Sequence, residues 1–217
     1  MEFGNLKIIV HFKYKYLKRF LDILFSSILI FLISPLIILI CVAIKLESRG
    51  PIIFKQKRIG KNLRHFNCYK FRTMSEEAED ILNQLLSKNP ELEKEFLTTQ
   101  KIKNDPRITN IGRILRKTSL DELPQIINIL KGDMHLIGPR PIVDSEKIRY
   151  GKYLNEVFSV RPGITGLWQV SGRNKLSYKR RVELDLIYIR NTNFKLDLNI
   201  FFRTIGVIIL PFDNGAF

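Results

Sequence analysis

A stretch of 22 residues without a charged side chain, from Ile23 to Ile44, constrains the fold of this chain more than any other feature. At about 1.5 Å per residue, one helix of this length would reach ~33 Å, which is enough to cross the hydrocarbon core of a bilayer. Helices buried in soluble proteins are rarely so long and so uniformly apolar, and a cleaved signal peptide would begin earlier and end in small residues. The stretch therefore predicts a membrane segment.

Ser34 and Pro35 interrupt the middle of this stretch. Proline in a helix interior removes a backbone hydrogen bond and favours a kink. Basic residues flank the stretch on both sides, namely Lys13, Lys15, Lys18 and Arg19 before it and Lys45, Arg49, Lys55, Lys57 and Arg58 after it. Positive residues prefer the cytoplasmic side of a membrane. We therefore expect a re-entrant helix that breaks at Ser34 and Pro35 and returns to the same face, with a straight span as the alternative.

The charge of the chain is strongly positive and unevenly distributed. Lysine and arginine number 36 against 21 acidic residues, for a net charge of +15, and residues 76–95 alone hold seven of the acidic residues. Such a surface binds anions, which include nucleic acid, anionic lipid and phosphorylated substrates. The aromatic residues follow no RNA-recognition pattern and zinc-finger spacing is absent, so we expect no nucleic-acid binding. Cys41 and Cys68 form no metal-binding or disulfide pattern, which fits a reducing, cytoplasmic setting.

An acidic pair of helices is expected after the first third of the chain. Thr73 and Glu76 form a capping-box pattern ahead of apolar residues at helical spacing. Asn89 and Pro90 end that helix and begin a second one. We expect an acidic helical hairpin over residues 74–100.

The remaining pattern predicts a mainly α-helical fold with a few short strands. Extended segments are expected at residues 52–54 and 66–71. Residues 138–141, Gly-Pro-Arg-Pro, form a rigid loop that presents Arg140, and residues 161–166 form a second loop of the same kind.

The C-terminal region predicts contact with a membrane surface. Residues 194–212 are apolar but interrupted by charges and a proline, which favours an interfacial amphipathic helix, with burial in the core as the alternative. The expected domains are an N-terminal segment at residues 1–14, the membrane anchor at 15–48 and a compact cytoplasmic catalytic domain at 49–217.

The run from Arg116 to Gln125 sets two adjacent carboxylates, Asp121 and Glu122, beside basic residues. Ser119 and Glu122 fit a capping box and Pro124 fits a first-turn proline, so the helix begins at one or the other, with the carboxylates at its positive end. A carboxylate held among arginine, lysine and helix N–H groups keeps a low pKa and can act as a nucleophile or metal ligand. A charged capping segment is the alternative.

Five short segments together carry a more specific indication. They are Tyr69-Lys70-Phe71-Arg72-Thr73-Met74, Asn104-Asp105-Pro106-Arg107-Ile108-Thr109, Ser119 to Gln125, Gly132-Asp133-Met134 with Gly138 to Pro141, and Arg161 to Arg173. In this order they resemble the bacterial sugar transferases of the polyprenyl-phosphate hexose-1-phosphate transferase family, the small monotopic phosphoglycosyl transferases. The resemblance covers roughly residues 15–205. Larger members carry an additional N-terminal domain with several spans, which we do not expect here.

The resemblance implies a specific reaction. A UDP-hexose, with galactose or glucose favoured, gives its hexose-1-phosphate to undecaprenyl phosphate at the membrane face and UMP leaves. In this family the aspartate of the Asp-Glu pair attacks the sugar-side phosphorus, and the lipid phosphate then attacks the phosphosugar-enzyme intermediate. By position, the resemblance makes Asp121 the nucleophile and Glu122 the residue that binds or orients Mg²⁺.

Basic side chains are expected to neutralise the diphosphate so that a carboxylate can approach it. Arg116, five residues before the nucleophile, and Arg140, held between two prolines, are the first candidates. Lys70 and Arg72 are further candidates, although they could equally meet lipid headgroups. The sequence assigns no role to Asp185, Asp197 and His135.

Together these features predict a protein of the bacterial inner membrane, on its cytoplasmic face and docked on membrane lipids. A homodimer is a further hypothesis, and the glycan pathway stays open among O-antigen, capsule, exopolysaccharide and glycoprotein. The alternative is a non-enzymatic, basic scaffold protein on the membrane surface. It would explain the charge and the apolar stretch, but not the Asp-Glu pair or the rigid loops.

Overall fold

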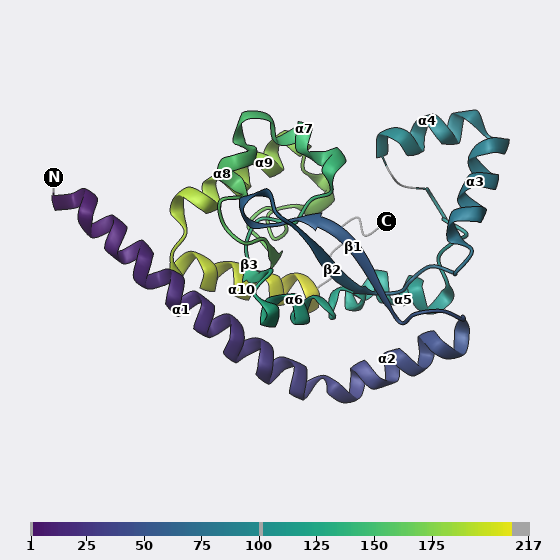
Figure 1. Ribbon diagram of the computed structural model, residues 1–217, viewed down its shortest axis with the longest axis horizontal. Helices are drawn as coiled ribbons and strands as arrows, with labels where there is room; N and C mark the ends of the chain where they lie inside the picture. The colour runs from purple at the N-terminus through teal and green to yellow at the C-terminus, as the bar shows by residue number, and fades with distance from the viewer. Residues whose placement is uncertain (1, 100–101, 210–217) are drawn as a thin grey trace. The chain divides into compact units, whose positions relative to one another are not determined.

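A computed structural model describes residues 2–99 and 102–209 of the chain (Figure 1). The described residues divide into two compact units. The first unit contains residues 2–33, 55–69 and 124–209, and the second contains residues 34–54 and 70–123, without 100 and 101. Each unit is therefore built from segments that are distant in the sequence.

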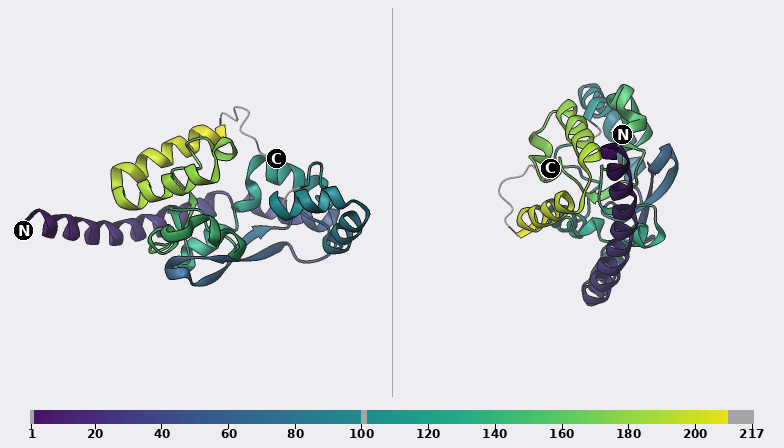
Figure 2. Two further views of the ribbon diagram at one scale, coloured as in Figure 1. Left: turned by 90° about the horizontal axis from the view of Figure 1, so that it is seen from above. Right: turned by 90° about the vertical axis from the view of Figure 1, so that its left-hand side faces the viewer.

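The fold is mainly helical with a few short strands, as expected. The helices are α1 (Glu2–Leu32), α2 (Ser34–Glu47), α3 (Ala78–Lys88), α4 (Pro90–Thr99), α5 (Asn110–Thr118), α6 (Gln125–Lys131), α7 (Lys147–Tyr150), α8 (Leu154–Val157), α9 (Tyr178–Asn191) and α10 (Phe194–Ile209). The strands are β1 (Ile53–Ile59), β2 (His65–Phe71), β3 (His135–Ile137) and β4 (Gly163–Thr165). β1 pairs with β2, and β3 pairs with β4 in parallel. Figure 2 shows α9 and α10 as a hairpin of two helices.

The expected interruption of the apolar stretch is confirmed. α1 ends at Leu32 and α2 begins at Ser34, so that Pro35 lies in the first turn of α2, where its missing N–H costs no intrahelical bond. Among the described residues, no single helix is long and apolar enough to span a membrane. The segments Tyr14–Leu32 and Ser34–Glu47 satisfy that test together, with a bend of 62° at the break.

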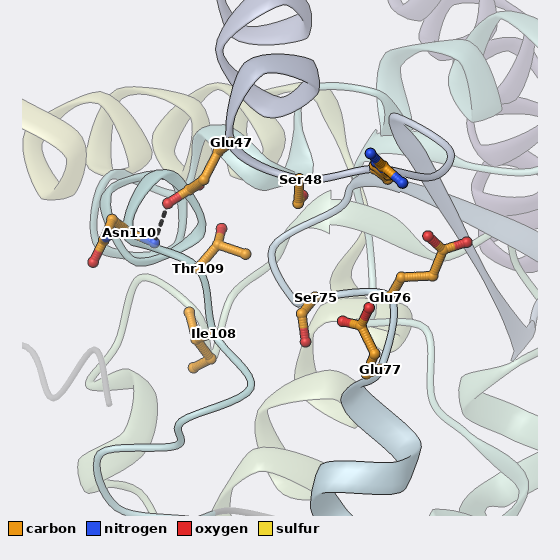
Figure 3. Close-up of a pocket in the computed structure, with 9 residues that line it drawn as sticks. Glu47, Ser48, Ser75, Glu76, Glu77, Ile108, Thr109 and Asn110 are labelled. Carbon is orange, nitrogen blue, oxygen red and sulfur yellow. Dashed lines mark hydrogen bonds between the residues drawn. The ribbon is translucent and has the colours of Figure 1, made fainter.

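In the second unit, α2 supports α5. Ile40 and Ile44 of α2 are buried together with Phe71 of β2 and Leu115 of α5. At the end of α2, the carboxylate of Glu47 accepts hydrogen bonds from two backbone N–H groups of the first turn of α5, Asn110 at 2.7 Å and Ile111 at 3.0 Å (Figure 3). The start of α5 is therefore fixed by apolar packing and by a cap from outside the helix.

The acidic hairpin is confirmed as α3 and α4, and Asn89 caps α4 by accepting from the N–H of Leu92 at 3.1 Å. The expected capping box is wrong, however. α3 begins at Ala78, and the side chain of Thr73 accepts a hydrogen bond from Arg116. The hydroxyl of Thr73 therefore accepts from a distant residue, Arg116, and does not cap the helix that follows it.

The second predicted loop contains a strand. Residues 163–165 form β4, with Gly163 paired to His135 and Thr165 to Ile137. A Cβ atom on Gly163 would lie 2.1 Å from the backbone nitrogen of Gly138, so this approach of the two segments requires glycine. Local turn signals concealed the strand because its partner lies about 28 residues earlier in the chain.

Polar side chains of α1 are buried and many of its apolar side chains are exposed, which is the reverse of the pattern of a helix in a soluble protein. The side chains of Asp22 and Ser26 are buried, whereas the apolar side chains of α1 point outward. The exposed set includes Leu17, Phe20, Ile23, Leu24, Phe25, Ile28, Leu29, Phe31 and Leu32. A helix with polar residues turned inward and apolar residues turned outward is suited to a lipid environment.

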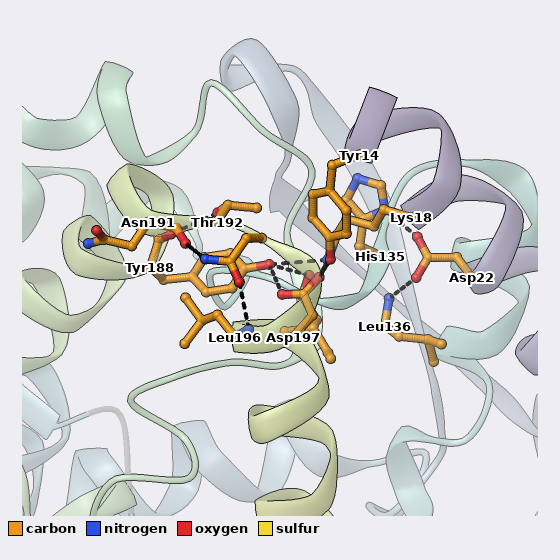
Figure 4. Close-up of polar contacts among 12 residues, drawn as sticks. Tyr14, Lys18, Asp22, His135, Leu136, Tyr188, Asn191, Thr192, Leu196 and Asp197 are labelled. Carbon is orange, nitrogen blue, oxygen red and sulfur yellow. Dashed lines mark hydrogen bonds and ion pairs between the residues drawn. The ribbon is translucent and has the colours of Figure 1, made fainter. Parts of the chain in front are cut away.

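Buried polar contacts attach α1 to the rest of the first unit (Figure 4). Lys18 forms an ion pair with Asp197 of α10, which also accepts hydrogen bonds from Tyr14 and from Tyr188 of α9. Asp22 contacts the ring of His135 and accepts a 3.0 Å hydrogen bond from the N–H of Leu136. Asp197 and His135, which the sequence left without a role, therefore hold α1 in place.

α10 extends the apolar surface of α1 within the first unit. Its exposed apolar residues are Phe194, Leu198, Phe201, Phe202 and Ile205. Phe201 stacks on Phe25 of α1 with ring centroids 6.5 Å apart, while Asp197 and Ile200 are buried. This arrangement favours the interfacial alternative for α10, as far as Ile209; residues 210–212 of the expected segment lie outside the described residues.

We expect Lys18→Met to destabilise the folded chain by about 3–5 kcal/mol, because it leaves the buried carboxylate of Asp197 without its cation. Thermal or denaturant unfolding in a lipid nanodisc measures the change. Lys15→Met, at an exposed position on the same helix, is the matched control and should change stability by about 0.5 kcal/mol or less. Equal effects of the two substitutions would show that the ion pair does not hold α1.

Candidate active site

The Asp-Glu pair lies on a short turn between α5 and α6. α5 ends at Thr118 because Ser119 adopts a left-handed conformation with φ of 58°, and Leu120–Glu122 then form one 3-10 turn. The side chain of Ser119 caps nothing, so the predicted capping box is wrong. α6 begins at Gln125 and Pro124 is its N-cap residue. This lies one residue from the second predicted start, in which Pro124 was in the first turn. The carboxylates therefore directly follow the C-terminus of α5.

Lys70, near the end of β2, lies beside both carboxylates. Its Nζ is 2.7 Å from Oε1 of Glu122 and 3.6 Å from Oδ2 of Asp121. The side chains of Lys70, Asp121 and Glu122 are 18%, 13% and 21% exposed. The three charged side chains are thus mostly buried, but part of each remains exposed and accessible to a substrate.

Burial raises the pKa of Asp121 above the ordinary range of aspartate. The positive charges of Lys70 and Arg116 oppose this shift, and the negative charge of Glu122 adds to it. The sequence predicted a low pKa from the basic neighbours, and that prediction is wrong because desolvation of the carboxylate outweighs their attraction. Deprotonated Asp121 is therefore a poorly solvated anion, which is a property of an activated nucleophile.

Arg116 belongs to the same cluster. Its Nε donates a 2.9 Å hydrogen bond to the hydroxyl of Thr73. Burial lowers the pKa of its guanidinium, and the negative charges of Asp121 and Asp105 oppose that shift. The N–H of Thr109 donates to the backbone oxygen of Thr73 at 3.1 Å. Arg116 is therefore held near Asp121 by its contact with Thr73, which is itself bound to the segment that precedes α5.

The sequence missed the role of Asp105 and Arg107. The guanidinium of Arg107 donates from Nε to Oδ1 of Asp105 at 2.8 Å and from Nη2 to Oδ2 at 2.6 Å, and both side chains are buried. The backbone oxygen of Arg107 accepts from the N–H of Ser75 at 2.9 Å. This bidentate pair fixes the loop ahead of α5. The Asp-Pro-Arg pattern, with opposite charges two residues apart around a proline, was the available signal.

The other predicted phosphate ligands lie elsewhere. Arg72 is buried and donates from Nη2 to the backbone oxygen and hydroxyl of Ser48, both at 2.8 Å. Arg140 belongs to the first unit, on the loop after β3. Within the second unit the structure thus brings together Lys70, Arg116, Asp121 and Glu122.

Glu122, the residue expected to bind Mg²⁺, lies beside Asp121 and has the oxygen ligands that this cation prefers. No group of three or more His, Cys, Asp and Glu residues that could hold a metal exists in the described part of the chain. Mg²⁺ commonly takes one or two carboxylates and completes its shell with water and substrate phosphate oxygens. The pair therefore suits a cation that binds together with a phosphate, and not one enclosed by protein ligands alone.

We expect Asp121→Asn to raise the melting temperature near neutral pH. The pKa of Asp121 is raised by folding, so its ionisation costs stability as the pH rises through that pKa, and the amide removes this cost. The gain should disappear at a pH below the ordinary aspartate pKa. Thermal unfolding of both proteins across a pH series measures it.

Asp105→Asn is the control, because we expect it to change the melting temperature in the opposite direction from Asp121→Asn. Although burial opposes it, hydrogen bonds from Arg107 lower the pKa of Asp105, so this carboxylate stabilises the fold above the ordinary aspartate pKa and loses that effect as the pH falls. Asp105→Asn should therefore lower the melting temperature at neutral pH. A lower melting temperature for Asp121→Asn as well would contradict the raised pKa.

Comparison with known proteins identifies the family of this chain. Residues 13–211 match the family model described as bacterial sugar transferase. The chain is 44% identical over 193 residues to the exopolysaccharide production protein ExoY of Rhizobium meliloti, a match that covers 89% of this chain and 85% of the relative. It is 47% identical over 193 residues to an uncharacterized sugar transferase of Haemophilus influenzae, covering 89% of this chain and 41% of the relative.

A third relative has a more specific name. The chain is 44% identical over 195 residues to the undecaprenyl-phosphate galactose phosphotransferase of Salmonella typhimurium, covering 90% of this chain. It spans only 41% of the length of that relative, the same share as for the Haemophilus protein. By the extent of these matches, the chain belongs to the bacterial sugar transferase family.

Proposed function

We propose that this chain transfers a hexose-1-phosphate from a UDP-hexose to undecaprenyl phosphate and releases UMP. The observation that carries the proposal is the mostly buried cluster of Asp121, Glu122, Lys70 and Arg116, which combines an activated carboxylate with cations suited to a diphosphate. Relatives named for galactose and glucose transfer to undecaprenyl phosphate support the choice of substrates. Relatives named as exopolysaccharide production proteins favour the start of surface polysaccharide assembly as its role.

The reaction proceeds in two displacements. An oxygen of Asp121 forms a bond to the sugar-side phosphorus, and the bond from that phosphorus to the bridging oxygen breaks, so that UMP leaves with the electron pair. A phosphate oxygen of undecaprenyl phosphate then attacks the same phosphorus and releases the carboxylate of Asp121. No general base is needed in the first step, because the deprotonated carboxylate of Asp121 is itself the nucleophile.

The neighbouring side chains neutralise charge. Lys70 and Arg116 lie close enough to Asp121 to attract the donor diphosphate into the cluster, and Arg140 is proposed as a further phosphate ligand. Glu122 is proposed to hold Mg²⁺, which neutralises phosphate oxygens when bound. Lys70 bridges both carboxylates in the ligand-free chain, so it also limits their mutual repulsion.

The membrane attachment is proposed to be re-entrant, on the cytoplasmic face of the inner membrane. The break between α1 and α2, the basic flanks and the outward apolar face of α1 support this arrangement. The exposed aromatic residues of α10 suit the headgroup region. A site at this depth meets the phosphate of a lipid acceptor, and basic residues at the surface attract anionic lipid.

Repeated turnover, measured as steady-state UMP release, should depend on undecaprenyl phosphate, Mg²⁺ and one UDP-hexose. We expect the purified chain in detergent or nanodiscs to release UMP with UDP-galactose or UDP-glucose, and Asp121→Asn to abolish release, because an amide is neutral and a poor nucleophile. The measurement is UMP formed across a panel of UDP-hexoses. Asp144→Asn, at an exposed carboxylate in the first unit, is the control that should retain turnover.

Two outcomes would contradict the proposal. Turnover in Asp121→Asn equal to that of the unchanged chain would exclude the covalent intermediate and leave direct attack by the lipid phosphate. A folded chain without UMP release for any donor in the panel would favour the scaffold interpretation.

The two ends of the chain should be accessible from the same side of the membrane. If the anchor is re-entrant, tags at the N- and C-termini are both protected in intact cells and both labelled after the inner membrane is opened. A membrane-impermeant reagent measures this accessibility. An N-terminal tag that is labelled from the periplasm would exclude the re-entrant anchor and establish a straight span.

A further inference from the structure

Basic side chains from three separate segments of the first unit lie close to one another. They are Lys15 and Arg19 of α1, Lys61 of the turn between β1 and β2, and Arg161 of the segment before β4. Lys15 and Arg19 are four residues apart, so they share one face of α1. Burial lowers the pKa of Lys61, and the positive charges of Lys15 and Arg161 lower it further. These three cations therefore lie within electrostatic reach of one another.

Two guanidinium groups of this set meet beside Gly132, which follows α6. A Cβ atom on Gly132 would lie 3.5 Å from Nη2 of Arg19 and 3.8 Å from Nη2 of Arg161. Arg19 donates from Nη1 to the backbone oxygen of Ile129 at 2.6 Å and from Nη2 to that of Leu130 at 3.0 Å. A cation at the C-terminus of a helix is stabilising, so Arg19 has a structural role at the end of α6. The guanidinium of Arg161 lies beside it without that role.

Backbone hydrogen bonds hold the segments that carry Lys61 and Arg161. Next to Lys61, the N–H of Asn62 donates to the oxygen of Phe158 at 2.6 Å. Next to Arg161, the oxygen of Pro162 accepts a 2.8 Å hydrogen bond from the first residue of β3. Phe158 and Arg161 are three residues apart, so the two segments are attached to each other. The positions of both cations are therefore set by the fold and not by their own flexible side chains alone.

No carboxylate neutralises Lys61 or Arg161 within residues 2–99 and 102–209. Neither side chain forms a hydrogen bond or an ion pair there. The carboxylates of this region are occupied, since Asp22 is bound to β3 and Asp133 accepts from Nδ2 of Asn128 at 3.2 Å. Like charges that are held together without a counter-charge repel, and a bound anion removes that repulsion.

The outer face of α1 indicates what kind of anion this is. On the same turns that carry Lys15 and Arg19, the side chains of Tyr16, Leu17 and Phe20 are exposed. Aromatic and apolar side chains next to basic ones are typical of a membrane interface. A lipid whose tails lie against this face can place its phosphate beside the basic side chains. A guanidinium such as that of Arg161 binds phosphate oxygens through two parallel N–H groups.

We propose that Lys61 and Arg161 bind the headgroup phosphate of an anionic phospholipid such as phosphatidylglycerol, while Lys15 and Arg19 add positive charge from α1. A zwitterionic headgroup suits this site less, because its ammonium group meets the same positive charges. The acceptor phosphate reacts at Asp121, and none of these four side chains belongs to the Asp121 cluster. The phospholipid is therefore a structural ligand that holds α1 at headgroup depth. The proposal rests on the membrane attachment in the proposed function, but not on the reaction.

Binding of a short-chain lipid to the full chain in detergent tests this assignment. We expect dioctanoyl phosphatidylglycerol to raise the melting temperature until the site is saturated, because a ligand of the folded state stabilises it, and dioctanoyl phosphatidylcholine to raise it far less. Lys61→Gln and Arg161→Gln should each raise the apparent Kd for phosphatidylglycerol about fivefold, as for one cation near an anionic lipid. Neither substitution removes a side-chain hydrogen bond within the described residues, so both variants should fold.

Lys179→Gln is the matched control, because it removes the same charge from an exposed position on α9 and should leave the Kd unchanged. Equal binding of the two phospholipids, or an unchanged Kd in both cluster variants, would overturn the proposal. An equal shift with inorganic phosphate alone would assign a free anion and overturn it as well. A shift with undecaprenyl phosphate and none with phosphatidylglycerol would assign the cluster to the acceptor instead.

This measurement needs no turnover, so it separates the lipid site from the proposed reaction. Binding of phosphatidylglycerol by a chain that releases no UMP would refute only the reaction. UMP release by a chain that does not bind phosphatidylglycerol would refute only the lipid site.

Discussion

A charged side chain that is buried away from water needs a partner of opposite charge. Within each unit, this requirement determines which helices and strands are held together. In the first unit, Lys18 is buried against Asp197 and Asp22 against His135, so α1 is oriented by polar contacts and not by an apolar interface. Its apolar residues are then free to face outward. In the second unit, Lys70 is held between two carboxylates at the proposed site of reaction. Pairing of buried charges therefore both orients α1 and forms the proposed active site.

Incomplete pairing distinguishes the functional regions from the structural ones. Asp105 and Arg107 satisfy each other through a bidentate contact, and the pKa of Asp105 is low despite burial. Asp121 is also buried, but its cations do not compensate for its desolvation and its pKa is raised. At Asp121 the folded chain therefore holds free energy that a ligand with complementary charge can recover.

Local features were predictable from the sequence, and tertiary ones were not. The interruption at Pro35 follows from the backbone chemistry of proline, and the strands and acidic hairpin follow from residue pattern. The family could be recognised from the order of the motifs. The left-handed conformation of Ser119 could not be predicted, because a residue other than glycine adopts a positive φ only when the surrounding structure imposes it. Neither the pKa of Asp121 nor the partner of Lys18 is encoded nearby, since burial and contacts across 179 residues determine them.

This separation along the chain has a consequence for synthesis. Lys18 emerges from the ribosome 179 residues before Asp197, and at about 5–20 residues per second the interval is roughly 9–36 s. If α1 enters the membrane as proposed, its apolar face can contact the lipid during that time, before Lys18 has Asp197 as its partner. Long basic side chains extend to the headgroups under these conditions, which keeps the helix at the interface. Under the proposed arrangement, the synthesis of α10 then replaces lipid phosphate with the carboxylate of Asp197 as the partner of Lys18, and this ion pair fixes the orientation of α1.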